Sequence, residues 1–273
     1  MFRAYFDMKN VPFSRKVPPE MLYESAAMAE ALGRMKYVAQ EKLFGVVTGD
    51  AGCGKSTLVR RLVSELPRDK YIVLYLSDSK LTPKWLYNGL IQQLGGTQKF
   101  YRGDAKIELL RQIEMLRGLQ NKNVVCILDE AHLLDKDTLE EFRFFLNTKI
   151  DSESPMALLL VGQTELRTDK LRLQRYAAIR QRIDWSCTLP HLDRAETEKY
   201  ILSHLTYAGG SQDIFTSRAL DEIFRASTGI PRVVNRICEK SLMHAFQQQK
   251  RLIDDHMVLY VIDSETLRER GTK

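Results

Sequence analysis

The chain has 273 residues, 44% of them hydrophobic, which is enough to pack one large domain or a core with a small satellite. No apolar run approaches the roughly 18 residues needed to cross a bilayer, and the N-terminus lacks the basic and then apolar pattern of a secretory signal. We therefore expect a globular, cytoplasmic protein without a membrane partner.

The net charge of +6 is unevenly distributed. Residues 191–273 carry 12 basic and 12 acidic side chains, so the whole excess, 29 basic against 23 acidic, lies in residues 1–190. A basic surface favours a polyanion such as nucleic acid, although a modest excess also serves solubility alone. The four cysteines are far apart and show no paired spacing, which indicates reduced thiols rather than a disulfide frame or a zinc site.

A phosphate-binding loop is predicted between Phe44 and Leu66. An apolar, β-branched strand is followed by a glycine-spaced turn, and a helix opens at Lys55. The glycines let successive N–H groups point inward, where the helix N-terminus adds its partial positive charge to hold phosphates. Lys55 would bridge the β- and γ-phosphates of ATP, and Ser56 would ligate Mg²⁺. The expected nucleotide contacts are Gly49, Asp50, Ala51, Gly52, Cys53, Gly54, Lys55, Ser56 and Thr57.

The segment before this loop, residues 1–43, contains paired aromatics and prolines and then a helical pattern from about Ser25 to Gln40. Two interpretations are equally supported: the segment wraps the core near the adenine, or it is a packing arm on that core. We treat residues 1–43 as an N-terminal arm and helix that pack on the core.

Residues 71–76 form a continuous apolar run, typical of a strand buried on both faces. A helix is expected after Pro83, up to Gly95, and another from about Lys106 to Leu119. Between them, residues 97–104 are basic and include two adjacent aromatics. This loop is either a nucleic-acid contact or a solvated turn whose aromatic side chains tuck into the core.

The stretch from Asn123 to Glu130 reads as a buried strand that ends in two carboxylates. This places Asp129 and Glu130 at the C-terminal tip of a parallel strand, where open α/β sheets keep their ligands. Asp129 would hold Mg²⁺, and Glu130 would orient or deprotonate the attacking water. Since the run at 71–76 precedes this strand, we expect at least one strand inserted between it and the phosphate-loop strand, an order that favours a hydrolase over a kinase.

A fourth strand is predicted from Pro155 to Gly162, and a polar residue, Gln163, stands at its tip. Gln163 would sense the γ-phosphate or position water, or it would cap the following helix. The segment from Leu171 to Ile183 carries four arginines ahead of a fifth strand near residues 185–189. These arginines would reach a neighbouring subunit's nucleotide, or they would form an ordinary basic helix face.

From Asp193 onward the pattern is wholly helical and predicts a small α-helical lid. Asp193 and Thr216 have the character of helix N-caps. Arg232 falls in the first turn of a predicted helix, an unfavourable place for a cation unless an anion is also there. This position therefore favours a contact between Arg232 and phosphate.

Together, GDAGCGKS at 49–56, VVCILDE at 124–130, Gln163, QRI at 181–183 and GIPR at 229–232 resemble the AAA+ ATPases, specifically the ExeA-like branch. The VPFS segment at 11–14 is also similar, so the resemblance covers nearly the whole chain. It implies a P-loop NTPase of the α/β class with a five-stranded parallel sheet flanked by helices, followed by a small α-helical lid domain. The expected domains are residues 44–192 for the nucleotide-binding domain and 193–273 for the lid.

By position, the resemblance also implies functional roles. Lys55 and Ser56 would serve phosphate and Mg²⁺, Asp129 and Glu130 would form Walker B, and Gln163 would be sensor 1, in place of the asparagine that most AAA+ proteins use. Arg182 or Arg180 would be the arginine finger and Arg232 sensor 2. DNA contacts of the transposition helpers in this branch, which resemble MuB, TnsC and IstB, correspond here to Lys80, Lys84, Lys99 and Arg102.

These features predict an ATP-dependent, oligomerising ATPase, forming a ring or helical filament, that binds double-stranded DNA and assists a DDE-type transposase. One alternative is an ExeA-like secretion or assembly ATPase whose partner is a protein. A third interpretation is a stand-alone regulatory NTPase in which nucleotide binding, not turnover, is the output.

Overall fold

The structure is a computed structural model that describes residues 2–78, 81–145 and 154–270. Contacts within the chain divide it into two compact units. The sheet unit holds residues 27–51 and 55–189, and the helical unit holds the residues up to Ala26, the short stretch Gly52–Gly54 and the residues from Pro190 onward.

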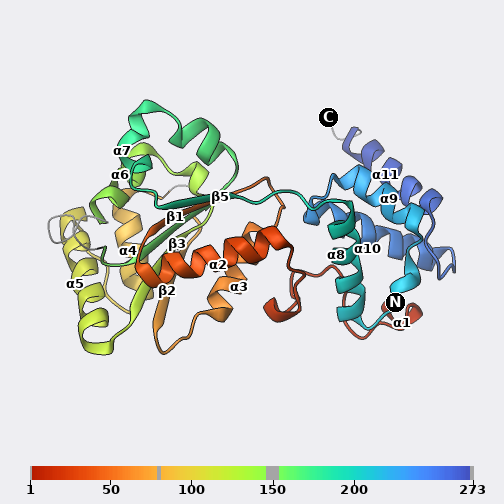
Figure 1. The fold of residues 1–273 in the computed structure, drawn as a ribbon, viewed down its shortest axis with the longest axis horizontal. Helices are drawn as coiled ribbons and strands as arrows, with labels where there is room; N and C mark the ends of the chain where they lie inside the picture. The colour runs from red at the N-terminus through yellow and green to blue at the C-terminus, as the bar shows by residue number, and fades with distance from the viewer. Residues whose placement is uncertain (1, 79–80, 146–153, 271–273) are drawn as a thin grey trace. The chain divides into compact units, whose positions relative to one another are not determined.

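A five-stranded parallel sheet forms the centre of the sheet unit, as the sequence predicted. Its strand order is β2, β3, β4, β1, β5, and each neighbouring pair runs parallel. Helices flank this sheet (Figure 1). The strands are β1 (Phe44–Thr48), β2 (Tyr71–Leu76), β3 (Asn123–Leu128), β4 (Ala157–Gly162) and β5 (Trp185–Thr188), and the helices are α2 (Ala26–Glu41), α3 (Lys55–Glu65), α4 (Pro83–Gln93), α5 (Arg102–Gln120), α6 (Lys136–Phe145) and α7 (Ala177–Arg180).

Strand β2 lies at an edge of the sheet, which corrects the expectation that residues 71–76 are buried on both faces. Only Leu74 of this strand is buried, and Tyr75 is 41% exposed. One strand does separate β1 from β3, but it is β4, whose six residues are all buried. An apolar run indicates that a strand is covered by other elements, but it does not indicate the position of that strand in the sheet or which strands pair with it.

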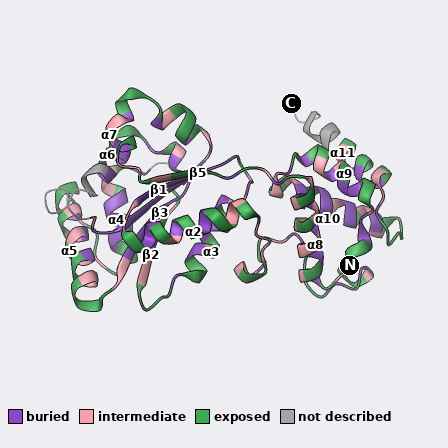
Figure 2. Ribbon diagram, viewed as in Figure 1, coloured by how far each residue is buried: buried purple, intermediate pink, exposed green. Residues whose placement is uncertain are grey.

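The register of the sheet brings the carboxyl ends of three strands together. Thr48 at the end of β1 pairs with Gly162 at the end of β4, and Leu128 at the end of β3 pairs with Leu160. These central strands are almost fully buried, as Figure 2 shows, and their side chains pack with residues such as Tyr87 and Phe142. The segments that follow β1, β3 and β4 therefore start from one edge of the sheet.

The helical unit has its own core. Its helices are α1 (Phe2–Tyr5), α8 (Arg194–Ala208), α9 (Ser217–Ser227), α10 (Pro231–Gln247) and α11 (Asp255–Arg270). The two predicted N-caps are confirmed: Asp193 accepts from Glu196 N at 2.7 Å in a capping box, and Thr216 accepts from Ala219 N at 3.1 Å. Among the described residues, no helix combines the length and the apolar character that a membrane crossing requires.

The N-terminal arm divides at Ala26. Phe6, Met8 and Phe13 are buried in the core of the helical unit, whereas α2 contributes Met35 and Val38 to the interior of the sheet unit from Ala27 onward. The first 26 residues thus pack in the helical unit, whereas the sequence indicated one arm that packs on the nucleotide-binding core. Apolar side chains in an arm predict that the arm is buried. Which part of the protein buries it depends on contacts with residues distant in the sequence.

A buried histidine joins this arm to α8. The Nδ1 atom of His204 accepts from the backbone N of Phe13 at 3.2 Å, and the two rings stack with centroids 5.1 Å apart. The Nε2 atom has no hydrogen-bond partner among the described residues. Burial therefore lowers the pKa of His204 to about 4, since a charged imidazole would lose its hydration there.

We expect the helical unit to lose stability on mild acidification because of His204. In the folded state its pKa lies below the unfolded value of about 6.5. As pH falls from 6.5 towards 4, His204 is therefore protonated in the unfolded chain but not in the folded chain, which favours unfolding. The free energy of unfolding should be about 2 kcal/mol lower at pH 5 than at pH 7.5 from this residue alone.

Urea unfolding of wild type and of His204→Asn at the two pH values measures this difference. Asparagine keeps an acceptor for Phe13 N and cannot titrate, so the variant should lose about 2 kcal/mol less on acidification. An equal loss in both proteins would contradict the assignment.

Candidate nucleotide site

The predicted phosphate loop connects β1 to α3 in a conformation that requires glycine. Gly52 and Gly54 adopt φ values of 90° and 106°, which L side chains rarely tolerate. Lys55, the first residue of α3, is 8% exposed, and its Nζ donates to Gly49 O at 2.7 Å and to Asp50 O at 2.9 Å. The ammonium group thus lies against the backbone of the loop, within reach of phosphate oxygens that the loop would hold.

Asp129 follows the last residue of β3 and is 6% exposed. Its Oδ2 accepts from Ser56 Oγ at 3.3 Å and from Tyr75 Oη at 2.9 Å, and its Oδ1 accepts from Glu130 N at 2.9 Å. The hydroxyl and the carboxylate predicted to ligate Mg²⁺ therefore come together from α3 and from the end of β3. Both are hard oxygen ligands of the kind Mg²⁺ prefers beside phosphate oxygens.

Tyr75 is a residue that the sequence analysis missed. It projects from β2 to the Asp129 carboxylate, and burial, followed by its hydrogen bond to Asp129, raises its pKa to about 12. Gln93 of α4 brackets the backbone of Tyr75, accepting from its N and donating to its O, both at 2.9 Å. The only available sequence signal was a tyrosine inside an apolar run, which is normally a packing residue.

Glu130 has the left-handed φ of 54°, an uncommon conformation for a residue with a side chain. Its carboxylate is 46% exposed, and its Oε2 lies 3.5 Å from Nδ1 of His132. Gln163 follows β4, and its backbone N donates to the same Nδ1 at 3.3 Å. The next residue, Thr164, donates to Asp50 Oδ1 at 2.8 Å, which ties the tip of β4 to the phosphate loop.

Two of the predicted arginines have structural contacts. Arg180 Nη1 donates to the carbonyls of Leu171 and Arg172 at 2.9 and 3.0 Å, so it connects the two ends of the segment between η3 and α7. Arg182 is half-buried and also has contacts of its own. The arginine-rich segment from Leu171 to Ile183 is not one helix. It starts where the π-helical turn η3 (Leu166–Leu171) ends, and it contains a 3-10 turn, η4 (Gln174–Tyr176), and the short helix α7.

Arg232 lies in the first turn of α10, as predicted. Within the helical unit, its backbone N lies 3.3 Å from Gly52 O, and a Cβ added at Gly52 would stand 2.7 Å from the Arg232 Cβ. Gly52 is therefore required for its φ and also for this close approach.

The predicted DNA contacts fall on α4, α5 and the loop between them, except Lys80, which lies outside the described residues. Lys84 Nζ stands 4.6 Å from the Phe100 ring centroid. The side chain of Asn88 accepts a hydrogen bond from Lys99 N at 2.8 Å and donates one to Lys99 O at 3.0 Å. Arg102 Nη1 donates to Oε1 of the buried Glu141 at 3.0 Å. Arg102 thus balances a buried charge as well as facing solvent.

The aromatic side chains of this loop are exposed, which excludes the interpretation that they tuck into the core. Phe100 is 77% exposed and Tyr101 68%, and Trp85 of α4 is 55% exposed. We call the surface formed by Lys84, Trp85, Lys99, Phe100 and Tyr101 the α4–α5 surface. Large apolar side chains interleaved with lysines are typical of a binding surface.

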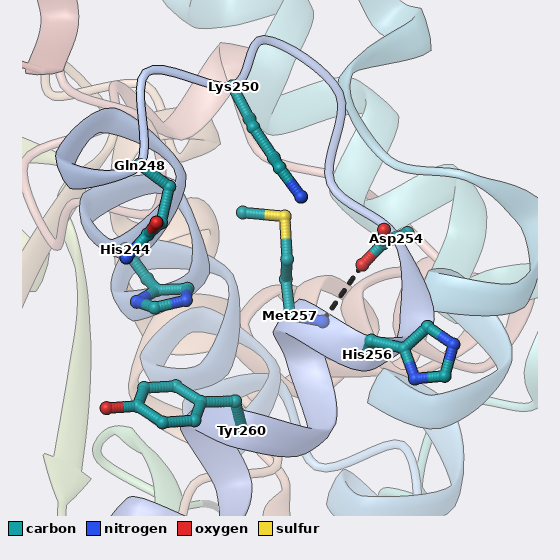
Figure 3. A pocket seen from close by; sticks show the side chains of 7 residues that line it. All are labelled: His244, Gln248, Lys250, Asp254, His256, Met257 and Tyr260. Atoms are coloured by element: carbon teal, nitrogen blue, oxygen red, sulfur yellow. Dashed lines mark hydrogen bonds between the residues drawn. The ribbon is translucent and has the colours of Figure 1, made fainter.

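A separate pocket of about 470 Å³ lies in the helical unit, where α10 ends and α11 begins (Figure 3). The ring of His244 stacks on Tyr260 with centroids 4.6 Å apart, and Asp254 accepts from Met257 N at 2.9 Å as the N-cap of α11. None of the predicted nucleotide-binding residues lines this pocket. In the described part of the chain, no cluster of three His, Cys, Asp or Glu side chains is arranged to hold a metal.

Comparison with known proteins agrees with this geometry. Residues 38–168 match the family model described as AAA domain. The whole chain aligns at 31% identity, over 278 residues, with general secretion pathway protein A of Aeromonas hydrophila. The alignment spans 50% of that relative, so the chain corresponds to about half of its length.

Among solved structures, Cdc6p from Pyrobaculum aerophilum matches with a TM-score of 0.67 at 18% identity, over 88% of this chain and 67% of that one. The Aeropyrum pernix ORC1 protein in complex with DNA matches with a TM-score of 0.67 at 13% identity, over 93% and 69% of the two chains. At such identities the likeness is one of fold. The predicted P-loop AAA+ fold, with a five-stranded parallel sheet flanked by helices, is confirmed.

Lys55→Ala should weaken ATP binding by at least tenfold while leaving the fold intact, because it removes the cation beside the loop and only two hydrogen bonds to backbone carbonyls. Titration with a fluorescent ATP analogue measures the affinity, and thermal unfolding checks the fold. Lys70→Ala, which removes an exposed lysine ahead of β2, is the matched control. Unchanged affinity in Lys55→Ala would rule out the loop as the phosphate site.

Proposed function

We propose that this chain, which carries an AAA domain, is an ATPase that hydrolyses ATP to ADP and phosphate with Mg²⁺. The observation that carries the proposal is the 3.3 Å contact between Ser56 Oγ and Asp129 Oδ2, with Lys55 immediately before Ser56 at the start of α3. A phosphate loop alone indicates binding. A loop whose hydroxyl meets a strand-end carboxylate, followed at once by Glu130, supports hydrolysis as well.

Each residue has one task in this proposal. The backbone from Gly49 to Thr57 cradles the phosphates, and Lys55 binds their β and γ oxygens. Ser56 and Asp129 hold Mg²⁺, which when bound neutralises charge that develops on the phosphates. Glu130 orients the attacking water and accepts its proton, since its carboxylate is accessible at the end of the sheet.

Glu130→Gln should bind ATP with affinity within about twofold of wild type and lower kcat by about 10² or more. The substitution keeps the shape of the side chain and removes the base, so ground-state contacts survive while the barrier rises. Phosphate release and nucleotide titration separate the two quantities. Glu165→Gln, which changes an exposed carboxylate just beyond Thr164, controls for loss of charge. A wild-type kcat in Glu130→Gln would remove Glu130 from the mechanism.

We infer that the active form is a homo-oligomer, a ring or helical filament, in which an arginine reaches the neighbour's nucleotide. Arg182 and Arg180 are the two candidates for this role, and both have contacts within their own subunit. Arg232 and Gln163 are assigned to sensing the γ-phosphate.

For the partner, we propose double-stranded DNA, bound at the α4–α5 surface. The net positive charge lies in residues 1–190, and this surface presents lysines beside exposed aromatics. Lys84, Lys99 and Arg102 contact phosphates in this proposal, together with Lys80. DNA binding would suit a transposition helper that selects target DNA and activates a DDE-type transposase.

A second candidate is an ATPase that acts on a protein partner in secretion or assembly. The 31% identity to general secretion pathway protein A, along the whole of this chain, favours it. Exposed Trp85, Phe100 and Tyr101 suit a protein partner as well as DNA. Salt dependence separates the two, because binding to phosphates releases counterions and binding through aromatic contacts does not.

If the DNA proposal holds, random-sequence duplex should bind only with an ATP analogue present, and its affinity should fall steeply from about 50 to 200 mM salt. Lys84→Ala with Lys99→Ala should weaken every duplex alike and reduce the salt slope by about 2. Fluorescence anisotropy measures both.

Lys16→Ala with Lys70→Ala is the matched control, since it removes two exposed lysines from other places in the chain. Equal losses in the two double variants would reduce the effect to net charge. Absence of DNA binding at the lowest salt would favour the protein-partner candidate.

A further inference from the structure

His132 stands between two residues of the candidate site. It belongs to the 3-10 turn η2 (Ala131–Leu133), which follows β3 directly, and its side chain is only 13% exposed. One ring nitrogen, Nδ1, meets both neighbours: the backbone N of Gln163 at 3.3 Å and Oε2 of Glu130 at 3.5 Å. The ring therefore bridges the ends of two adjacent strands, β3 and β4.

The chemistry of a single nitrogen makes these two contacts exclusive. Towards the N–H of Gln163, Nδ1 must offer its lone pair, whereas towards the Glu130 carboxylate it must carry a proton and donate. Neutral imidazole has two tautomers, and each satisfies one partner. A carboxylate facing the bare lone pair of Nδ1 would be repelled, so the tautomer decides where Glu130 points.

The position of the ring is set by the backbone around it. Lys170 Nζ donates to the carbonyls of His132 and Leu134, both at 2.5 Å, which clamps η2 onto η3. A Cβ added at Gly162 would lie 3.1 Å from His132 N, so the turn packs directly on the end of β4. The backbone of the turn therefore has little room to move, which keeps the ring beside the end of β4.

We propose that His132 is a positioning residue for hydrolysis, which holds the Glu130 carboxylate through Nδ1–H and releases it when Nδ1 lacks that proton and accepts from the amide of Gln163. This inference rests on the proposed ATPase function. It links the strand tip that carries Gln163 to the orientation of Glu130, a carboxylate that is otherwise nearly half exposed. Misplacing a catalytic group by about 1 Å can cost 10²-fold in rate, so a loose Glu130 is expected to be slow.

Two nearly isosteric substitutions test the donor role. His132→Asn places a donor and an acceptor where Nδ1 stands, so it can serve Glu130 and Gln163 alike, whereas His132→Asp can accept from Gln163 N but repels Glu130. We expect His132→Asn to keep kcat within about threefold of wild type. We expect His132→Asp and His132→Ala to lower kcat at least tenfold, with the affinity for an ATP analogue unchanged.

Further measurements separate positioning from folding. Thermal unfolding should place the Asn and Asp variants within a few degrees of each other, and His256→Asn, which changes an exposed histidine of the helical unit, serves as control. In a Glu130→Gln background, His132→Ala should cause no further loss of kcat, because its effect passes through Glu130.

The outcomes are distinct. Equal kcat in the Asn and Asp variants, or an additive loss in the Glu130→Gln background, overturns the role of His132 while the ATPase proposal stands. Absence of hydrolysis in wild type, with ATP binding unaffected by Lys55→Ala, overturns the ATPase proposal and the inference with it.

Discussion

The parallel register of the central strands is the constraint on which the candidate site depends. Because β1, β3 and β4 run in one direction and end at nearly the same level, the loop after β1, Asp129 after β3 and Gln163 after β4 emerge at one edge of the sheet. Almost complete burial of these strands holds the register, since a slip by one residue would exchange the side chains that pack into the layers on the two faces.

Polar side-chain contacts at this edge connect the strand ends, in addition to the hydrogen bonds of the sheet. Ser56 and Tyr75 both donate to Asp129, Thr164 donates to Asp50, and His132 contacts both Glu130 and Gln163. Apart from the contact between His132 and Glu130, which both follow β3, each contact joins residues that belong to different strands or to the segments after them. A shift of a side chain at one strand tip therefore alters contacts at the next strand tip. Such coupling suits a site where phosphate binding and the orientation of a water-directing carboxylate must coincide.

The α4–α5 surface is also connected to that edge. Asn88 on α4 holds the backbone of Lys99, and Gln93 at the end of the same helix holds the backbone of Tyr75, whose hydroxyl meets Asp129. The helix thus contacts the proposed partner surface at one point and an edge strand of the sheet at another. Exposed aromatic side chains beside lysines suit either of the partners proposed for this surface.

The sequence by itself determined the features that are local in the chain. A strand followed by glycines and Lys55 predicts a phosphate loop because the spacing of its residues is the spacing of the site, and Asp193 and Thr216 announce helix starts because a cap bonds three residues ahead. Tertiary structure alone decided what depends on distant contacts. It made β2 an edge strand and put β4 between β1 and β3, it packed the first 26 residues in the helical unit, and it brought His132 to both Glu130 and Gln163. An apolar run or a lone histidine has the same pattern wherever the fold puts it, so its neighbours, and with them its role, appear only once the chain is folded.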